Sequence, residues 1–417
     1  MLINRSLKIF LYLLLIVLPL RESFALMIGE STPMRFGEML MALCPVFFLV
    51  YKEDYEEAKH TTSNLLLIFL VYSFVFGIGL GEHVLPSFAV KYFIRGILFF
   101  ILIRIAENKV IIITEECIEL LFKYTVIIEG FFFLMQMFGV TMLFGKFGPY
   151  VASETFGFQR LSGTASEPGY LIPIITPCVY YFISDFKKYS LWAITSIAIA
   201  VLSLSSFGYV AIMVVFLVRL FLSHRYSFLK SVLVSGLGFL FALLAASVMF
   251  PQVKDAYEGI STKIIAFSSF NEEDMDYSGA ERAENLIVAA EAFMEGGGKS
   301  KLLGQGVGAT AFYTENNVVM YKPAEEANNL YLSVMLNQGV IGLLLLLLLF
   351  FSIFQQTNKK ASSMALCIGF LTQLLQYFIV GNLWLYFFWF YIFFIIVINR
   401  QQRVEEYYVE DLIQKSK

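Results

Sequence analysis

Two cations lie inside one of the apolar stretches of the chain. Lys91 and Arg95 stand four residues apart within residues 87–106, so they would share one face of a helix. A charged side chain in a membrane is costly unless it reaches a polar cavity, a partner or the lipid headgroups. Lys91 is close enough to the end of the stretch to reach headgroups, whereas Arg95 would lie roughly 12 Å inside it. The spacing predicts either contact with headgroups or a polar cavity that Arg95 lines.

A second cationic motif precedes an expected helix. Here the chain reads Arg160-Leu-Ser-Gly-Thr-Ala-Ser-Glu167-Pro168. Proline suits the first turn of a helix and forces the residue before it into an extended conformation. The helix start then presents free N–H groups beside Arg160, whose planar guanidinium suits phosphate. The motif predicts an anion site or, alternatively, a capped helix next to a surface arginine.

A third polar group stands before another apolar stretch. The segment contains Glu325, Glu326, Asn328 and Asn329, followed by Leu330 and Tyr331 and by glycines at 339 and 342. These carboxylates and amides could contact a substrate or could be ordinary polar residues of a membrane interface. The nearby run from Gly304 through Gly306 to Gly308 lacks a βαβ context, which favours a tight turn over a nucleotide-binding loop.

The sequence indicates neither a metal site nor a cofactor. The three histidines are far apart, and the four cysteines fall in or beside apolar stretches, where a thiol is usually a small hydrophobe. The acidic run at residues 271–276 lacks the pattern of a twelve-residue calcium loop and favours a solvated turn over a calcium site. We therefore expect no metal, no cofactor and no disulfide framework.

The composition indicates which elements must hold these residues. The 417-residue chain is 58% hydrophobic and only 15% charged, which excludes a soluble enzyme. Its net charge of −3 leaves no basic surplus for nucleic acid. We expect an all-α polytopic membrane protein of about twelve transmembrane helices. The predicted spans are 7–27, 36–51, 62–80, 87–106, 115–139, 169–186, 190–205, 207–223, 229–250, 329–355, 361–380 and 382–399.

The distribution of lysine and arginine predicts the orientation. With both termini in the cytoplasm, most basic loop residues lie inside, and the short outer loops hold only Arg21, Arg35, Lys146 and Arg160. Residues 1–250 then carry nine spans, with a periplasmic site loop at 140–168. Residues 251–328 form one large periplasmic loop, residues 329–399 carry three more spans, and residues 400–417 form a cytoplasmic tail.

The large loop is expected to contain short helices. It has 13 acidic and 6 basic side chains. Residues 278–281 read Ser-Gly-Ala-Glu, the pattern of a capping box, and apolar residues then recur at helical spacing. Three glycines at residues 296–298 are expected to end that helix. Arg282 lies in its first turn.

In the order of these motifs the chain resembles the O-antigen polymerase and ligase family of bacterial polysaccharide assembly. The resemblance rests on Arg160 to Gly163 with Glu167-Pro168, the break Ser205-Ser206-Phe-Gly208, and one large late outer loop. Within and after that loop come Arg282, the Gly304 to Gly308 run, Asn329-Leu-Tyr331 and the glycines at 339 and 342.

The resemblance implies a metal-independent glycosyltransferase in the bacterial inner membrane, with its active site facing the periplasm. Its donor and acceptor would be undecaprenyl-diphosphate-linked oligosaccharides, polymerised into O-antigen or a related surface polysaccharide. A histidine usually precedes the asparagine in the ligase branch, and Asn328 stands there instead, which favours a polymerase. The resemblance also allows for a chain-length regulator protein as a partner.

The same resemblance suggests roles for individual residues. Arg160 and Arg282, with Arg95 as a further candidate, would stabilise the diphosphate leaving group, and Lys91 would contact the substrate. Glu326 or Glu167 would accept the proton of the attacking hydroxyl, which would invert the anomeric centre. Glu167, at the positive end of a helix, is the weaker base, so Glu326 is preferred. Further substrate contacts are expected from Asn328, Asn329, Tyr331 and Gly306.

Two other functions stay open at this stage. The first is ligation to lipid A core, and the second is transport of lipid-linked oligosaccharide or sugar. Transporters tend to have paired halves with matching broken helices, and the single late loop has no counterpart in the first half of this chain. The sugars of the repeat unit, its linkages and the oligomeric state leave no readable pattern.

Overall fold

The fold is a bundle of helices with two short antiparallel ribbons. The computed structural model describes residues 25–28, 32–35, 43, 45–46, 60–109, 111–138, 154–155, 158–159, 162–165, 168–203, 205–222, 277–317, 327–357 and 360–415. The ribbons pair β1 (Ala25–Ile28) with β2 (Thr32–Arg35) and β3 (Glu154–Thr155) with β4 (Phe158–Gln159). The helices are α3 (Thr61–Phe74), continued by the π-helix η1 (Val75–Gly79), α4 (Pro86–Asn108), α5 (Glu115–Met137), α6 (Pro168–Ser184), α7 (Phe186–Leu202), α8 (Ser206–Leu222), α11 (Tyr277–Glu295), α12 (Gly298–Leu303), α13 (Ala309–Asn317), α14 (Leu330–Phe354), α15 (Ala361–Gln376) and α16 (Tyr386–Lys415).

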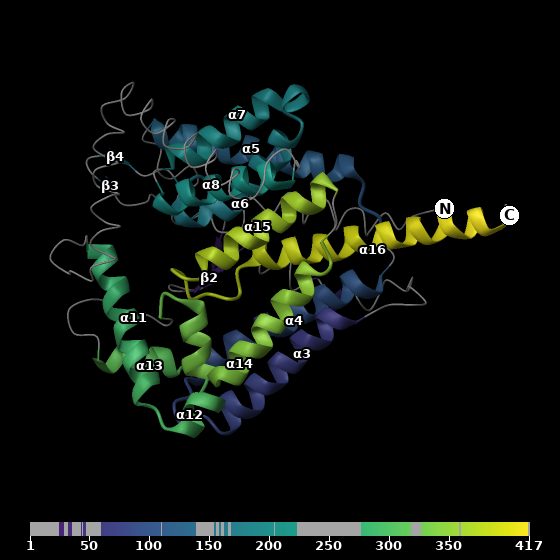
Figure 1. Cartoon of the computed structure of the whole chain (residues 1–417). Helices are drawn as coiled ribbons and strands as arrows, with labels where there is room; N and C mark the ends of the chain where they lie inside the picture. Colours follow the sequence, from purple (N-terminus) through teal and green to yellow (C-terminus); the bar gives the residue numbers. More distant parts are fainter. Residues whose placement is uncertain are drawn as a thin grey trace.

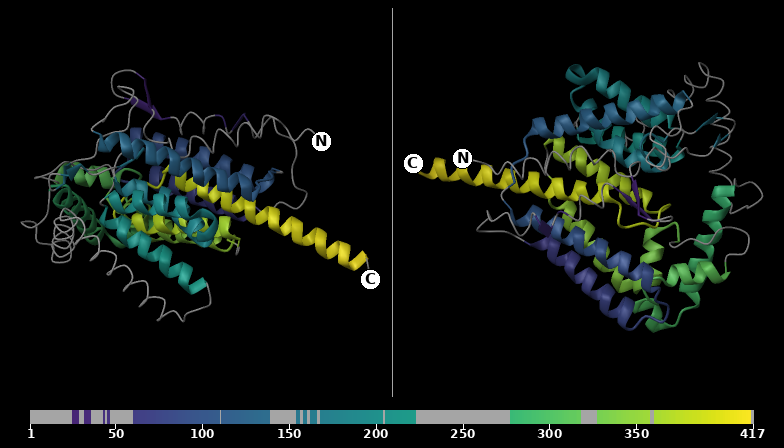
Figure 2. Two further views of the ribbon diagram at one scale, coloured as in Figure 1. Left: turned by 90° about the horizontal axis from the view of Figure 1, so that it is seen from above. Right: turned by 180° about the vertical axis from the view of Figure 1, so that it is seen from behind.

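Most of the described helices pack into one bundle, and α11, α12 and α13 gather at one of its ends. Helix α6 packs against α15, α7 and α8, α14 packs against α3, and α16 packs against α4 and α15. Figure 1 shows α11, α12 and α13 at one end, while α16 extends from the other. The two further views in Figure 2 agree on this arrangement. The two ends of the bundle therefore differ in structure.

Two prolines shape the inner part of α6. Proline has no N–H, so Pro177 cannot donate the helical hydrogen bond to the carbonyl of Pro173. The hydroxyl of Tyr391 on α16 donates to that carbonyl instead, at 3.1 Å. A backbone group freed within an apolar bundle must find such a partner. This bond explains how α6 tolerates an internal proline at the centre of the core.

Helix α14 is broken at Gly339, where φ is +72°. The break leaves carbonyls of the preceding turn to accept bonds from outside the helix. The N–H groups of Gln305 and Gly306 donate to the carbonyls of Leu336 and Asn337 at 2.9 and 3.1 Å. The glycine-rich segment at 304–308 is thereby docked on α14. It is a tight turn, as predicted, with positive φ at each of its three glycines.

Helix α5 holds a turn that lies outside it. The carboxylate of Glu129 accepts bonds from the N–H and hydroxyl of Thr164 at 2.8 and 2.6 Å. Seven residues further on, Gln136 accepts from the N–H groups of Ser162 and Gly163, each at 3.0 Å, and donates to the carbonyl of Gly163. Both side chains are buried. They fix the turn that separates Arg160 from Glu167 in the sequence.

The outer faces of the long helices carry large apolar side chains, as expected for a chain in lipid. Exposed examples are Leu67, Val71 and Phe74 on α3, and Leu344, Leu348 and Phe351 on α14. In the part of the chain that the structure describes, two helices, Thr61–Gly79 and Leu330–Phe354, are long and apolar enough to cross a membrane. Shorter apolar helices are Pro168–Ser184, Phe207–Leu220 and Ala361–Gln376.

Helical segments coincide with nine of the twelve predicted spans, which is consistent with the all-α expectation. Spans 229–250 and most of 7–27 and 36–51 lie outside the described residues. Three details of the prediction were wrong. Residues 25–28 form a strand, so a helix over 7–27 would have to end earlier. Helix α11 begins at Tyr277, so Ser278 lies within it and is not its cap. Helix α16 continues far beyond residue 399.

Candidate substrate-binding cavity

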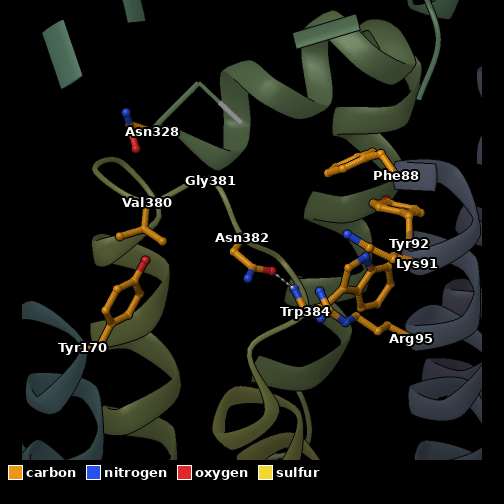
Figure 3. A pocket seen from close by; sticks show the side chains of 10 residues that line it. All are labelled: Phe88, Lys91, Tyr92, Arg95, Tyr170, Asn328, Val380, Gly381, Asn382 and Trp384. Atoms are coloured by element: carbon orange, nitrogen blue, oxygen red, sulfur yellow. Dashed lines mark hydrogen bonds between the residues drawn. The ribbon is translucent and has the colours of Figure 1, made fainter. Parts of the chain in front are cut away.

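A cavity of about 280 Å³ lies at the end of the bundle where four chain segments meet. The start of α4, the start of α6, Asn328 just before α14 and the α15–α16 connection all contribute to it. Its lining residues are Phe88, Lys91, Tyr92, Arg95, Tyr170, Asn328, Val380, Gly381, Asn382 and Trp384. In Figure 3 the α4 residues and Trp384 form one wall, Tyr170, Val380 and Asn328 lie opposite, and Asn382 lies between them.

Helix α4 supplies both cations of the cavity. Lys91 and Arg95 lie one turn apart, and Arg95 is half-buried while Lys91 is exposed. Tyr92, beside them, accepts a hydrogen bond at 2.8 Å from Gln338, the residue before the break in α14. The break in α14 therefore also supports the cavity wall. Of the two sequence-based alternatives for Arg95, the structure places it on a polar cavity.

Asn328 and its neighbours join α14 to the α15–α16 connection. Asn328 has φ of +52°, a left-handed conformation that asparagine tolerates better than most residues. Asn329 caps α14 by accepting from the N–H of Leu332 at 3.0 Å, and its amide donates to the carbonyl of Phe378. The hydroxyl of Tyr331 donates to the carbonyl of Leu374 at 2.8 Å. Asn328 lines the cavity, whereas Asn329 and Tyr331 anchor the backbone that carries it.

The remaining predicted site residues lie elsewhere or outside the described part. Arg282, on α11, does not line the cavity. Gly306 packs its backbone against that of His83, where an added Cβ would come within 2.9 Å of the carbonyl oxygen. Arg160, Glu167 and Glu326 fall outside the described residues. Chain neighbours of the two glutamates do reach the cavity, because Tyr170 is three residues after Glu167 and Asn328 is two residues after Glu326.

Sequence reasoning missed most of the wall opposite the cations and all of the α15–α16 connection. The available signal was the short polar break Gly381-Asn382 between two apolar stretches, on the side predicted to be periplasmic. The aromatic residues Phe88, Tyr92 and Trp384 carry no such signal, since aromatic residues are frequent throughout this chain.

The cavity is suited to an anion. Among the described residues that line it there are two cations and no carboxylate. The Asn382 side chain accepts from the N–H of Trp384 through its Oδ1 at 2.9 Å, which leaves its amide nitrogen as a donor. Preorganised donors in a site of low dielectric stabilise negative charge well. Within the described part of the chain, no three His, Cys, Asp or Glu side chains gather to hold a metal ion.

A comparison with protein families supports the resemblance seen in the sequence. Residues 191–347, which run from α7 into α14, match the family model described as O-Antigen ligase. The match covers less than half of the chain. It supports the O-antigen ligase and polymerase family of membrane glycosyltransferase-like enzymes, and it does not distinguish the two branches. No curated protein matches the chain.

Proposed function

We propose that this protein is a membrane glycosyltransferase that polymerises undecaprenyl-diphosphate-linked repeat units into O-antigen or a related surface polysaccharide. The proposed site faces the periplasm of a bacterial inner membrane. The observation that carries the proposal is the cavity in which Lys91 and Arg95 meet Asn328 and Asn382. Two cations with amides and aromatic rings suit a ligand that joins a diphosphate to a sugar.

In this reaction a hydroxyl of the acceptor sugar attacks C1 of the donor sugar. The bond between C1 and the phosphate oxygen breaks, and the lipid diphosphate leaves with the electron pair. Lys91 and Arg95 would stabilise the negative charge that develops on the leaving oxygen. Glu326, or alternatively Glu167, would take the hydroxyl proton. Both carboxylates stand next in sequence to segments that line the cavity, which supports assigning them to this site.

Ligation is the second candidate function, and a specific finding favours it. The family model that matches residues 191–347 is described as O-Antigen ligase. Asn328, at the place where the ligase branch usually has a histidine before the asparagine, favours the polymerase. The two functions share the donor and its diphosphate, and they differ in the acceptor.

A chain-length ladder separates the candidates. The purified full-length protein, in lipid nanodiscs, would be given a defined lipid-linked repeat unit with or without lipid A core. A polymerase produces a ladder from the repeat unit alone. A ligase transfers single units to lipid A core and makes no ladder. Absence of both products would contradict the proposal and favour transport.

Arg95 can be tested in the same assay. We expect Arg95→Ala to reduce polymerisation by about 10²-fold or more, because removing one preorganised donor to a developing oxyanion has effects of that order. Arg104→Ala is the matched control. Arg104 is on the same helix, at the other end of the bundle, where it donates to the hydroxyl of Ser63 at 3.1 Å. Equal activities of the two variants at equal protein levels would remove Arg95 from the site.

A further inference from the structure

The indole of Trp384 has an unsatisfied hydrogen-bond donor at the cavity. Trp384 is 3% exposed, and among the residues that the structure describes its Nε1 has no hydrogen-bond partner. A buried N–H without an acceptor costs folding free energy, and tryptophan usually finds a partner when buried. Trp389, five residues on, shows the usual case, since its Nε1 donates to the carbonyl of Leu383 at 3.0 Å. An unsatisfied donor in a cavity wall indicates that a ligand supplies the acceptor.

The surrounding residues hold this indole in one orientation. It stacks on Phe99 with ring centroids 5.7 Å apart and on Trp389 at 5.5 Å, and the edge of Tyr92 meets it at 5.0 Å. Its own backbone N–H is bound by Asn382. A Cβ at Gly96 would lie only 3.2 Å from the ring, so a larger residue there would crowd it. The N–H is therefore preorganised.

The neighbours of the indole indicate what kind of acceptor it meets. Lys91 and Arg95 line the same wall, as Figure 3 shows, and among the described residues Lys91 has no ion pair. Lys91, the indole N–H and the amide nitrogen of Asn382 are donors at the cavity, and Arg95 adds a second positive charge to the same wall. A ligand that accepts from these donors beside two cations must present several acceptor oxygens and negative charge. Phosphate oxygens have both properties, and a neutral sugar lacks the charge.

We propose that the Trp384 indole N–H donates to a phosphate oxygen of the lipid diphosphate, between Lys91 and Arg95. This inference rests on the proposed function for the identity of the lipid. It assigns to Trp384 a binding role, in which the indole selects for a phosphorylated polyprenol and against the unphosphorylated alcohol. The exposed side chain of Lys91 would turn towards the bound phosphate.

The test measures equilibrium binding with no acceptor present. The full-length protein in nanodiscs is titrated with undecaprenyl diphosphate, with undecaprenol and with inorganic pyrophosphate. Trp384→Phe keeps an aromatic ring and removes the N–H. We expect it to raise the Kd for undecaprenyl diphosphate about tenfold, in line with hydrogen bonds to charged groups, and to leave undecaprenol binding unchanged. A similar rise for inorganic pyrophosphate would show that the phosphate alone suffices, and a rise confined to the lipid would show that the polyprenol chain positions it.

Two further variants keep the outcome interpretable. Trp192→Phe, on α7 and outside the cavity, is the matched control and should bind like the parent. Asn382→Asp keeps the oxygen that holds Trp384 and replaces the donor with a charge that repels phosphate, so it too should weaken diphosphate binding. If Trp384→Phe does not fold, the Kd of Asn382→Asp for undecaprenyl diphosphate provides the test.

Specific outcomes would overturn the inference. These are an unchanged Kd in Trp384→Phe, an equal loss of undecaprenol binding, and no binding of undecaprenyl diphosphate by the parent. Failure of the proposed function is a separate result. A protein that binds the diphosphate through Trp384 and makes no ladder refutes polymerisation while the contact stands. A ladder with an unaltered Kd in Trp384→Phe refutes the contact alone.

Discussion

Gly163 allows the turn at residues 162–165 to pack directly against α5. Its φ is +59°, and an added Cβ would lie 2.2 Å from Oε2 of Glu129. Both the conformation and the space therefore require glycine. The partner of Glu129 is the turn at 162–165, which the sequence places between Arg160 and Glu167.

We expect Gly163→Ala to destabilise the protein by at least about 1–2 kcal/mol, the cost of a left-handed conformation for a residue with a Cβ. The displacement of Glu129 adds to this cost. Thermal unfolding in detergent micelles measures the effect. Gly130→Ala is the control, because its Cβ would meet only Ile199 at 3.7 Å within a helix that favours alanine. Equal unfolding temperatures for the two variants would show that the turn is not held as described.

Glu326 is the residue that we expect to accept the proton of the attacking hydroxyl. A glutamine in place of glutamate keeps the shape and removes the basicity. We expect Glu326→Gln to reduce the polymerisation rate by about 10²-fold or more, the order of general-base contributions elsewhere. Glu167→Gln should instead weaken substrate binding. Steady-state kinetics distinguishes a loss in kcat from a rise in KM. Full activity of Glu326→Gln with an inactive Glu167→Gln would reverse the roles, and two active variants would exclude a carboxylate base.

At the scale of elements, the break in α14 links the outer segment to the cavity. Because Gly339 leaves the helical conformation, carbonyls just before it bind the glycine-rich turn, and the hydroxyl of Tyr72 donates to the carbonyl of Gln338 at 3.0 Å. The side chain of Gln338 supports Tyr92 in the cavity wall. One break therefore connects α3, α4, α14 and the segment at 304–308. The sequence showed a glycine inside a span, but not which segment would bind there.

We expect Gly339→Ala to detach the glycine-rich turn, since its Cβ would lie 2.2 Å from the carbonyl oxygen of Leu302 and its φ is positive. Limited proteolysis of the segment around α12 should become faster, and the unfolding temperature should fall. Gly298→Ala is the matched control in the same region, because a Cβ there meets nothing within 4 Å. A proteolysis rate equal to that of Gly298→Ala would contradict the docking.

For the whole molecule, apolar length located most of the long helices that the structure describes. Pro168 starts α6, and the glycines at 296–298 follow the end of α11, as predicted. The cavity was only half predictable. Lys91 and Arg95 could be recognised because charge is rare in apolar stretches, whereas Trp384 resembles every other aromatic residue in the sequence. The place of Trp384 in the cavity wall depends on contacts among α4, α14 and α16, which no local sequence pattern predicts. The joining of Asn329 to Phe378 is likewise a long-range contact.

The helix ends that are predicted to be periplasmic lie together in the structure. The segments predicted to be periplasmic, namely the starts of α4 and α6, the residues before α14 and the α15–α16 connection, meet at one end of the bundle. The segment holding α11 to α13 lies at that same end (Figure 1). Which side of the membrane this end faces follows only from the positive-inside rule and stays a prediction. Single cysteines can decide it, in a variant whose four native cysteines are replaced by alanine.

We expect Lys299→Cys, on exposed α12, to react with a membrane-impermeant maleimide added to cells whose outer membrane has been permeabilised. Lys187→Cys, in the exposed first turn of α7, should react only after the inner membrane is opened, because it belongs to the other end of the bundle. The reverse pattern would place the cavity in the cytoplasm. A periplasmic lipid-linked donor could not reach it there, so that result would refute the proposed glycosyltransferase as well as the orientation. Labelling of both sites in intact inner membranes would mean that the two ends share a side, which the alternating path of α4, α5 and α6 through the bundle forbids.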